Sequence, residues 1–592
     1  MEDKRGLWNR IELRRRSRGL KKQARRAEGA TVRHARRFVF NRWENIREVR
    51  LHIILWLGGV GLLIAVVGLQ MIWFQTSYVR SAAVSGGTYA EAVRGPINTL
   101  DPLYAVSAAE LSASQLLFSS LYALDSTGHL HGDIAQAMTN DNDRTFTVTM
   151  RHDARWHDGQ PLKADDVVFT VNLMKNPTVR SVMNASWRGI DVRKVDDYTI
   201  QFVLPASYAA FPQALTFAIL PKHLLEAVEP ASLRESGFSE APIGSGPFKL
   251  RLLQTVTEAS GRKIVHLAAN TDYYGGKPRL DRFQLHSYSD DEAIGRALRT
   301  GEVSAASDIP GYIASAIDKS RYDTVTTPLN SGVYAIFNAA QPALKDINVR
   351  RALQIGTDTA AVRQALFDKP EPMDLPFAKR QVVGSETLSA PAYNQEAAAK
   401  LLTDNGWTLQ NGIRTKGADK LQLRIVTRKN SDYEKTLEVL SGQWRRLGVD
   451  VQTQVVDTSD GRQNFTQDIL QRRDYDVLLD ELTIGADPDV FAYWHSRGLL
   501  NFSSYSNPVS DDALSSARTR SDAALRAVKY VTFAKQWLAD APAIGLYQSD
   551  LIYARSKSAR SIAPDEVIVE PNEHYANVRY WTADQGTVYK TP

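Results

Sequence analysis

The sequence contains no cysteine, which removes several classes of chemistry at once. Disulfide bonds, thiolate metal sites and a cysteine nucleophile are all excluded. A lipid-modified N-terminal cysteine, the usual anchor of bacterial surface-binding proteins, is excluded for the same reason. Any attachment of this chain to a membrane therefore has to come from another segment.

Recognisable enzyme motifs are also lacking. The segment IGSGP (residues 243–247) does not match Gly-x-Ser-x-Gly, and we interpret it as a turn that needs glycine conformations. The sequence shows no glycine-rich phosphate loop of the required pattern. Four histidines lack metal-site spacing, and we interpret them as surface-loop residues: His129, His131, His152 and His157. We therefore expect neither an enzyme nor a bound metal or cofactor.

Positive charge is concentrated at the start of the chain. Residues 1–50 hold 17 Lys and Arg against 6 Asp and Glu, whereas the remaining residues hold 55 against 60. Nucleic-acid binding is one interpretation of such a basic tail. We favour contact with anionic lipids of the inner leaflet combined with a topology signal, and we expect no nucleic-acid partner.

An apolar run without any charged residue follows the basic tail, at Ile53–Phe74. As a helix, 22 residues span about 33 Å, which is enough for the hydrocarbon core of a bilayer. Trp56 and Trp73 lie near its two ends, as in an aromatic belt. A cleaved signal peptide is the alternative, but its apolar region usually has only about 7–15 residues. We predict an uncleaved single-pass anchor, with the tail in the cytoplasm and the body outside.

The body shows short apolar strands alternating with amphipathic helices, which indicates an α/β fold. Residues 163–175, 346–367 and 396–405 match helices, and the middle stretch matches two helices of which Asp358 caps the second. The stretch 420–427 is typical of a strand. No internal repeat or low-complexity segment is visible.

Six short segments of the body occur in an informative order. They are TLDPLYA (99–105), ARWHDGQPLKADDVVFTV (154–171), PIGSGPFKL (242–250), YYGGKPRLDRFQLHSY (273–288), NAAQPALKDINVRRAL (338–353) and YNQEAAAKLLTDNGW (393–407). Each segment alone is a weak signal. Together, at this spacing, they make the body resemble the family 5 extracellular solute-binding proteins, the oligopeptide- and dipeptide-binding components of ABC importers. The resemblance runs from about residue 87 to about residue 580.

The resemblance implies a two-lobed periplasmic-binding-protein-like fold of type II with an extra inserted domain, behind an N-terminal transmembrane helix. Lobes of this kind close on a ligand by hinge motion. The implied division is a basic cytoplasmic tail 1–50, a transmembrane helix 51–75, a linker 76–87, lobe I at 86–125, 241–339 and 543–584, an inserted domain 126–240, and lobe II at 340–542.

The function implied is that of a membrane-anchored extracellular receptor, which captures peptides and delivers them to the permease of an ABC transporter. Two alternatives stay open. The same fold could bind a non-peptide solute, such as a nickel chelate, haem or a sugar. It could also be a ligand-sensing scaffold that acts through the basic tail.

The candidate site is the segment DVLLDELTIGADPDVFAYWHS (476–496). It begins like a buried strand and then breaks into a loop that carries Glu481 and Asp487. In peptide binders of the family this loop reads Trp-x-x-Asp-x-x-acid-Pro, and its Asp captures the α-amine of the peptide. Counted back from Pro488, Ile484 stands at the Asp position and Glu481 at the Trp position. Either Glu481 substitutes for the missing Asp, or the ligand lacks a free amine.

Asp487 keeps the acid before the proline, and it is either a ligand residue or a cap of the following helix. The remaining candidates for ligand contact have core packing as their alternative: Tyr334, Asn338, Tyr493 and Trp494. The first two lie on a crossover strand expected at 331–338, and the other two follow the loop.

Overall fold

The computed structural model describes residues 43–257, 261–458 and 464–589. The chain forms two compact units, Met1–Ala82 with Gly586–Pro592, and Ala83–Gln585, which we call the body. In the first unit, helix α2 (Trp43–Tyr78) contains a stretch, Arg50–Trp73, that is long and apolar enough to cross a membrane and has exposed side chains. This stretch overlaps the predicted span. The basic tail lies largely outside the described residues.

A small sheet of two strands follows α2, made from β1 (Val79–Val84) and β21 (Asp584–Tyr589). It pairs the segment that directly follows α2 with the last strand of the described residues. The rest of the described secondary structure belongs to the body.

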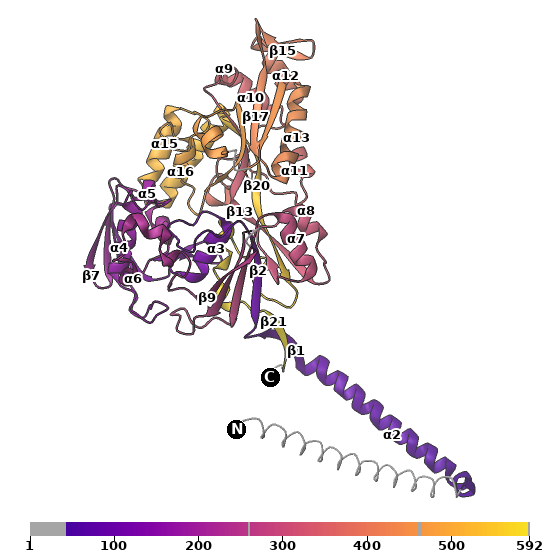
Figure 1. Ribbon diagram of the computed structural model, residues 1–592. Helices are drawn as coiled ribbons and strands as arrows, with labels where there is room; N and C mark the ends of the chain where they lie inside the picture. The colour runs from indigo at the N-terminus through magenta and orange to yellow at the C-terminus, as the bar shows by residue number, and fades with distance from the viewer. Residues whose placement is uncertain (1–42, 258–260, 459–463, 590–592) are drawn as a thin grey trace. The chain divides into compact units, whose positions relative to one another are not determined.

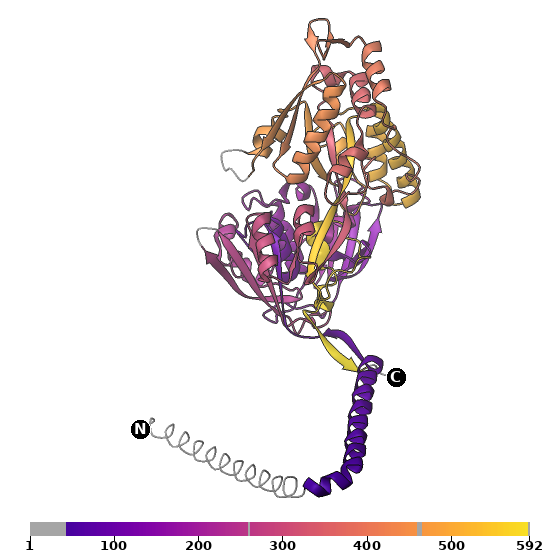
Figure 2. The ribbon, with the colours of Figure 1, turned by 90° about the vertical axis from the view of Figure 1, so that its right-hand side faces the viewer.

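One ten-stranded sheet runs through the whole body (Figure 1). From one edge to the other its strands are β18 (Asp450–Val456), β17 (Gln422–Arg428), β19 (Val477–Thr483), β13 (Tyr322–Phe337), β20 (Ala543–Ser556), β12 (Ala305–Ala306), β2 (Thr88–Arg94), β11 (Arg282–Tyr288), β10 (Arg262–Ala269) and β9 (Phe248–Thr257). The two central strands, β13 and β20, are the longest and pair antiparallel. They connect the two halves of the body, and Figure 2 shows β20 in yellow passing from one half to the other.

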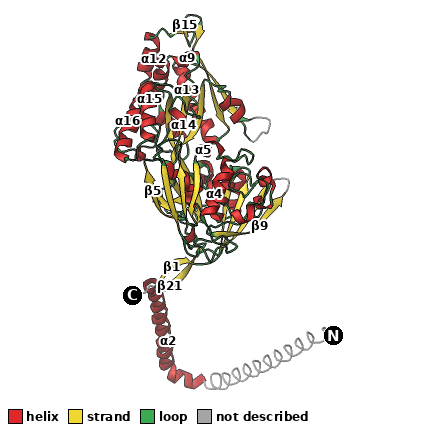
Figure 3. Cartoon of the chain, turned by 90° about the vertical axis from the view of Figure 1, so that its left-hand side faces the viewer, coloured by secondary structure: helices red, strands yellow, loops and turns green. Residues whose placement is uncertain are grey.

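We call the half with β17, β18 and β19 lobe II. Side chains on β19 alternate between two hydrophobic clusters, with Val477 and Leu479 in one and Leu478 and Leu482 in the other. Both faces of this part of the sheet are therefore covered, as a buried α/β sheet requires. The covering helices are α9 (Pro342–Lys345), α10 (Ile347–Ile355), α11 (Thr359–Ala365), α12 (Gln395–Asp404), α13 (Ser431–Arg446), α14 (Phe491–Trp494), α15 (Pro508–Arg518) and α16 (Ala523–Asp540). Figure 3 shows α15 and α16 together on one side of this lobe. A three-stranded ribbon, made of β14 (Thr408–Gln410), β15 (Ile413–Lys416) and β16 (Asp419–Lys420), extends from it.

We call the half with β2 and β9–β12 lobe I. Its helices are α3 (Ala108–Leu117), α7 (Asp291–Thr300) and α8 (Gly311–Ala316). A separate four-stranded sheet, in the order β5 (Ala135–Asp141), β6 (Thr145–Met150), β8 (Thr199–Val203) and β7 (Asp191–Asp196), lies in the predicted inserted domain. This domain also holds β4 (Leu130–Gly132), which pairs with β3 (Tyr122–Leu124) from the end of the preceding lobe I stretch, and the helices α4 (Ala164–Lys175), α5 (Asn184–Trp187) and α6 (Lys222–Leu225).

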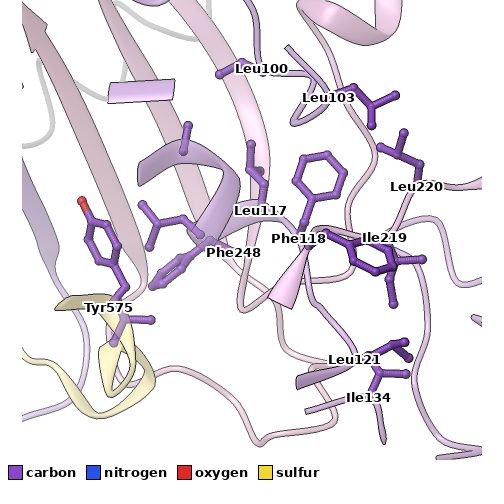
Figure 4. Close-up of a cluster of buried hydrophobic side chains, with 14 of the residues drawn as sticks. Leu100, Leu103, Leu117, Phe118, Leu121, Ile134, Ile219, Leu220, Phe248 and Tyr575 are labelled. Carbon is purple, nitrogen blue, oxygen red and sulfur yellow. The ribbon is translucent and has the colours of Figure 1, made fainter. Parts of the chain in front are cut away.

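Lobe I and the inserted domain share one hydrophobic core (Figure 4). Leu117 and Phe248 of lobe I belong to the same buried cluster as Ile134 and Ile219 of the insert, and Tyr575 from the C-terminal segment joins them. The two-lobed α/β fold is thus confirmed. The boundaries of the inserted domain stay a prediction, because the core is continuous across them.

Most of the expected elements are present, with two differences of length. The helix predicted at 163–175 is α4, which ends at its C-cap Asn176, and Asp358 caps α11 by accepting from the Ala361 amide. The crossover strand predicted at 331–338 is β13, which already begins at Tyr322. The loop that we expected to carry Glu481 begins after this residue. Strand β19 continues to Thr483, so Glu481 lies within the strand and pairs with Val333 of β13.

The turn IGSGP is correctly placed, but the reason for its glycines differs from the one expected. Gly244 and Gly246 do not have positive φ angles. A Cβ on Gly244 would lie 1.9 Å from the carbonyl oxygen of Leu117, and the Gly246 amide donates to that same oxygen at 2.8 Å. Glycine is needed here because two backbones approach closely.

Candidate functional site

Glu481 occupies a central strand of the sheet and not a loop. Its neighbours on that face of β19, Val477 and Leu479, are fully buried, whereas Glu481 itself is partly exposed near the end of the strand. Ser331 donates its hydroxyl to Glu481 Oε1 at 2.6 Å, and Tyr433 donates to Oε2 at 3.2 Å. Two hydroxyl donors from β13 and α13 therefore hold the carboxylate in place and compensate for part of its lost hydration.

The adjacent residue, Asp480, points to the opposite face and has a different partner. Its Oδ1 accepts from Arg428 Nε at 2.9 Å, and the side chain of Asp480 is almost buried. Burial raises the pKa of Asp480, while the guanidinium of Arg428 lowers it. Asp480 is thus an ion-paired residue of lobe II, and Glu481 is the acid whose partners are neutral hydroxyl groups.

Repulsion between acids of the two lobes contributes to the raised pKa of one carboxyl group in each lobe. Asp308 follows β12 in lobe I and its side chain is exposed; partial desolvation and then repulsion from Glu481 raise its pKa. Asp432, in the first turn of α13 in lobe II, has its pKa raised to about 6 by desolvation and by repulsion from Asp368 and Asp291. We call the place defined by Asp291, Asp308, Asp432 and Glu481 the inter-lobe junction.

Direct contacts show that the lobes meet beside this junction. A Cβ on Gly311, the first residue of α8 in lobe I, would lie 2.7 Å from Cβ of Phe367 in lobe II. The rings of Tyr312 and Phe367 have their centroids 6.5 Å apart. The segment that carries Asp308 is therefore packed against lobe II.

The rest of the predicted loop makes contacts inside lobe II. Ile484 is buried in a hydrophobic cluster, and its amide donates to the Asn330 carbonyl at 2.9 Å. Asp487 forms a bidentate ion pair with Arg526 at 2.7 and 2.8 Å. Of the two roles considered for Asp487, capping of the following helix is not seen, because Asp489 accepts from the Phe491 amide at 3.3 Å; a role in ligand binding stays a prediction.

Three of the four aromatic and amide candidates are buried in lobe II. Tyr334 donates to the Leu375 carbonyl at 2.8 Å and packs edge-on against Trp494. The side-chain amide of Asn338 donates to the Tyr475 carbonyl at 3.2 Å. Tyr493 is partly exposed, and its hydroxyl donates to the Thr483 carbonyl at 2.7 Å. Their contact with a ligand stays a prediction; in this structure Tyr334, Asn338 and Trp494 form the packing that supports the site.

Sequence reasoning missed the acids that lie around Glu481. Asp291, Asp308 and Asp432 come from three separate stretches, and no motif marks any of them. The only available signal was that Asp291 and Asp432 stand in the first turns of helices that are visible in the sequence. Only the packing of the lobes brings these separate stretches into electrostatic range of one another.

Other features of the described residues lie apart from this junction. No group of three or more His, Asp or Glu in the described part of the chain is arranged to hold a metal ion. A cavity of about 500 Å³ lies between lobe I and the inserted domain, where Tyr274 and Glu573 of the former and Asp133 and Arg151 of the latter belong to its wall. None of the seven predicted site residues lines this cavity.

Comparisons with known proteins agree with this architecture. The family model described as "Bacterial extracellular solute-binding proteins, family 5 Middle" matches residues 129–501. The oligopeptide-binding protein AppA of Bacillus subtilis is 27% identical over 477 residues, which cover 78% of this chain and 86% of AppA. Its solved structure, in complex with a nonapeptide, has a TM-score of 0.70 at 25% identity and covers 85% of this chain and 99% of its own.

Two further solved structures share the fold. The ABC transporter substrate-binding protein CtaP of Listeria monocytogenes has a TM-score of 0.73 at 26% identity, covering 84% of this chain and 99% of its own. NikZ of Campylobacter jejuni, solved with Ni(L-His), has a TM-score of 0.71 at 24% identity and the same coverage, which supports the fold alone. This family binds solutes and is not a family of enzymes. From the family match and the two-lobed architecture, the chain belongs to the family 5 bacterial extracellular solute-binding proteins.

Proposed function

We propose that this protein is a membrane-anchored extracellular receptor that binds peptides between its two lobes and delivers them to the permease of an ABC transporter. The relative AppA is an oligopeptide-binding protein and was solved with a nonapeptide, which supports a peptide ligand. The apolar stretch of α2 supports the anchor, because the chain has no cysteine that could carry a lipid. With the basic residues before it, the positive-inside rule favours a body outside the cell.

The observation that carries the proposal is Glu481. A carboxylate at the end of a central strand, fixed by two hydroxyl donors and repelled by an acid of the other lobe, is suited to bind an ammonium group. It occupies the segment in which the family's amine-binding Asp would stand, and Ile484 leaves that role unfilled. We assign the capture of the peptide α-amine to Glu481, with Tyr493 near the bound chain.

The test is calorimetric titration of the full chain in detergent with peptides of three to nine residues, each with a free or an N-acetylated terminus. A charged hydrogen bond contributes about 1.5–3 kcal/mol, so the free form should bind on the order of 10- to 100-fold more tightly. Glu481→Gln keeps most of the shape and should reduce this preference. Glu438→Gln, on the exposed face of α13, is the matched control and should leave it intact.

The outcomes separate the parts of the proposal. If neither form of any peptide binds, the peptide function is wrong. If both forms bind equally, the ligand is a peptide but no α-amine is captured. If the preference survives Glu481→Gln, another carboxylate captures the amine.

A further inference from the structure

The hydroxyl group of Tyr433 contacts both an acid and a base. It donates to Glu481 Oε2 at 3.2 Å, and Arg428 Nη2 donates to it at 3.5 Å. A carboxylate only accepts hydrogen bonds and a guanidinium only donates them, so the single phenolic proton has to point to Glu481. The oxygen of Tyr433 therefore lies between the carboxylate and the guanidinium.

The ring of Tyr433 is fixed by the core of lobe II. Tyr433 is 6% exposed and belongs to the same hydrophobic cluster as Leu437 and Leu479. It stands in the first turn of α13, where its amide donates to Oδ1 of Asn430 at 3.2 Å. Burial and then repulsion from Glu481 raise the pKa of Tyr433, so the hydroxyl keeps its proton at neutral pH. The group that donates to Glu481 is thus carried by a ring that packing holds in place.

Arg428, at the end of β17, is a cation with room to move. Its Nε donates to Asp480 Oδ1 at 2.9 Å, and its side chain is 41% exposed. Its Cζ lies 5.5 Å from the centroid of the Tyr433 ring. Burial lowers the pKa of Arg428, but its neighbours, with Asp480 first and Glu481 among them, raise it, so the guanidinium stays charged. Arg428 can therefore compete with a ligand for the charge of Glu481.

The Tyr433 hydroxyl is one of the two donors described for Glu481, and Ser331 supplies the other, to Oε1. If the hydroxyl were absent, Oε2 would lose its donor in a partly buried place, which is unfavourable unless a new donor replaces it. Arg428 Nη2 already contacts the same phenolic oxygen. A direct bond between the guanidinium and the carboxylate would join two opposite charges, and bonds of this kind are strong. Glu481 would then be neutralised by the protein itself.

We propose that Tyr433 is a positioning residue, whose hydroxyl keeps Glu481 apart from Arg428 and so reserves the carboxylate for the α-amine of the peptide. This inference rests on the proposed capture of the amine by Glu481 and adds the group that makes this capture possible. In this role Tyr433 does not contact the ligand. It acts through Glu481, because it holds one carboxylate oxygen and occupies the place that the guanidinium would take.

The experiment compares peptides of three to nine residues, each with a free or an N-acetylated terminus, by calorimetric titration of the full chain in detergent at neutral pH. Tyr433→Phe removes the hydroxyl and keeps the ring. It should reduce the ratio of free to N-acetylated affinity on the order of 10-fold, because a charged hydrogen bond to the amine is lost. The N-acetylated form should bind within about two-fold of wild type. A merely structural defect would weaken both forms alike and would overturn the inference.

A second background tests whether Arg428 is the competitor. Arg428→Gln combined with Asp480→Asn removes both charges of that pair, and removing both partners of a buried ion pair costs far less than removing one. In this background Tyr433→Phe should leave the ratio within about two-fold. An equal loss of the ratio in both backgrounds would show that Tyr433 only orients the carboxylate, which contradicts the inference. A background that has itself lost the ratio contradicts it too, because Arg428 would then support the site.

Tyr475→Phe is the matched control. Tyr475 is also buried in lobe II, but its hydroxyl donates to the Phe502 carbonyl, at 2.8 Å. Its loss should leave the ratio unchanged. Equal binding of both peptide forms by wild type, or a ratio that survives Glu481→Gln, refutes amine capture by Glu481, and the inference fails with it. A ratio that Glu481→Gln abolishes and Tyr433→Phe leaves intact overturns the inference alone. Near-identical circular dichroism spectra would show that the variants are folded.

Discussion

At the scale of single residues, the acids of the segment 476–496 have distinct physical roles. Asp487 is neutralised by Arg526, with both side chains only 15% exposed. Asp489 lies 2.8 Å from Arg518 and is nearly buried. Glu481 accepts hydrogen bonds from two hydroxyl groups, and the cation of Arg428 acts on it electrostatically without forming one of those bonds. The chemistry of each acid follows from its partner and not from its position in a motif.

Removing the charge of Asp487 should destabilise lobe II without abolishing recognition. Asp487→Asn leaves the Arg526 guanidinium without its counter-charge in a mostly buried place, which should cost about 3 kcal/mol. The measurement is the thermal midpoint of the body in the full chain. Asp512→Asn removes one partner of an exposed pair with Lys529 and should change stability by less than about 1 kcal/mol. A variant of Asp487 with unchanged stability but lost peptide binding would identify it as a ligand residue instead.

At the scale of elements, the C-terminal end of α15 links lobe II to the inserted domain. The Ala209 amide of the insert donates to the Arg518 carbonyl at 2.8 Å. The Arg518 guanidinium lies over the rings of Tyr208 at 4.7 Å and of Phe491 at 4.4 Å. Contacts of this kind span the two halves of the body, so they stabilise the arrangement in which the lobes are together.

Arg518→Ala should accelerate release of a bound peptide. The variant keeps the backbone bond to Ala209 but removes the cation from the Tyr208 ring, an interaction that contributes about 1 kcal/mol. It also removes the ion pair with the nearly buried Asp489, so the thermal midpoint of the variant is measured alongside its rates. The dissociation rate should rise roughly five-fold, while the association rate stays near that of wild type. Stopped-flow tryptophan fluorescence on the full chain measures both rates.

Arg520→Ala is the control, because Arg520 follows α15 and donates to the Ser516 carbonyl of that helix, within lobe II. It should leave the dissociation rate unchanged. If Arg518→Ala also has no effect on dissociation, this contact does not stabilise the closed arrangement.

At the scale of the whole molecule, the basic tail and the apolar stretch of α2 are expected to set the topology. Protease added to intact cells should remove the body and leave a small tail fragment with the membrane, because the tail would be cytoplasmic. The fragment is detected with an antibody against residues 1–42. A tail that is digested from outside, or a mature N-terminus near Ser85, would reject an uncleaved anchor.

Part of the site could be predicted from sequence and part could not. The sequence located the segment after a buried strand and singled out Glu481. It placed Glu481 in a loop, because an acid in an apolar run is typical of the end of a strand. The structure keeps Glu481 within β19, since Ser331 and Tyr433 supply donors from neighbouring elements. Neither Ser331 nor Tyr433 lies within the segment 476–496, so the sequence of that segment could not reveal these donors.

The sequence by itself determined the features that depend on neighbouring residues. The charge-free run of α2, the helix stops at Asn176 and Asn405, and the ordered motifs of the family are all written in short contiguous windows. Tertiary structure alone decided that Asp487 pairs with Arg526 and that Ser331 and Tyr433 donate to Glu481. It also decided that Gly244 is required by the backbone at Leu117. The physical reason is distance along the chain: electrostatic repulsion and steric contact act through space, between segments that only the packing of the lobes brings together.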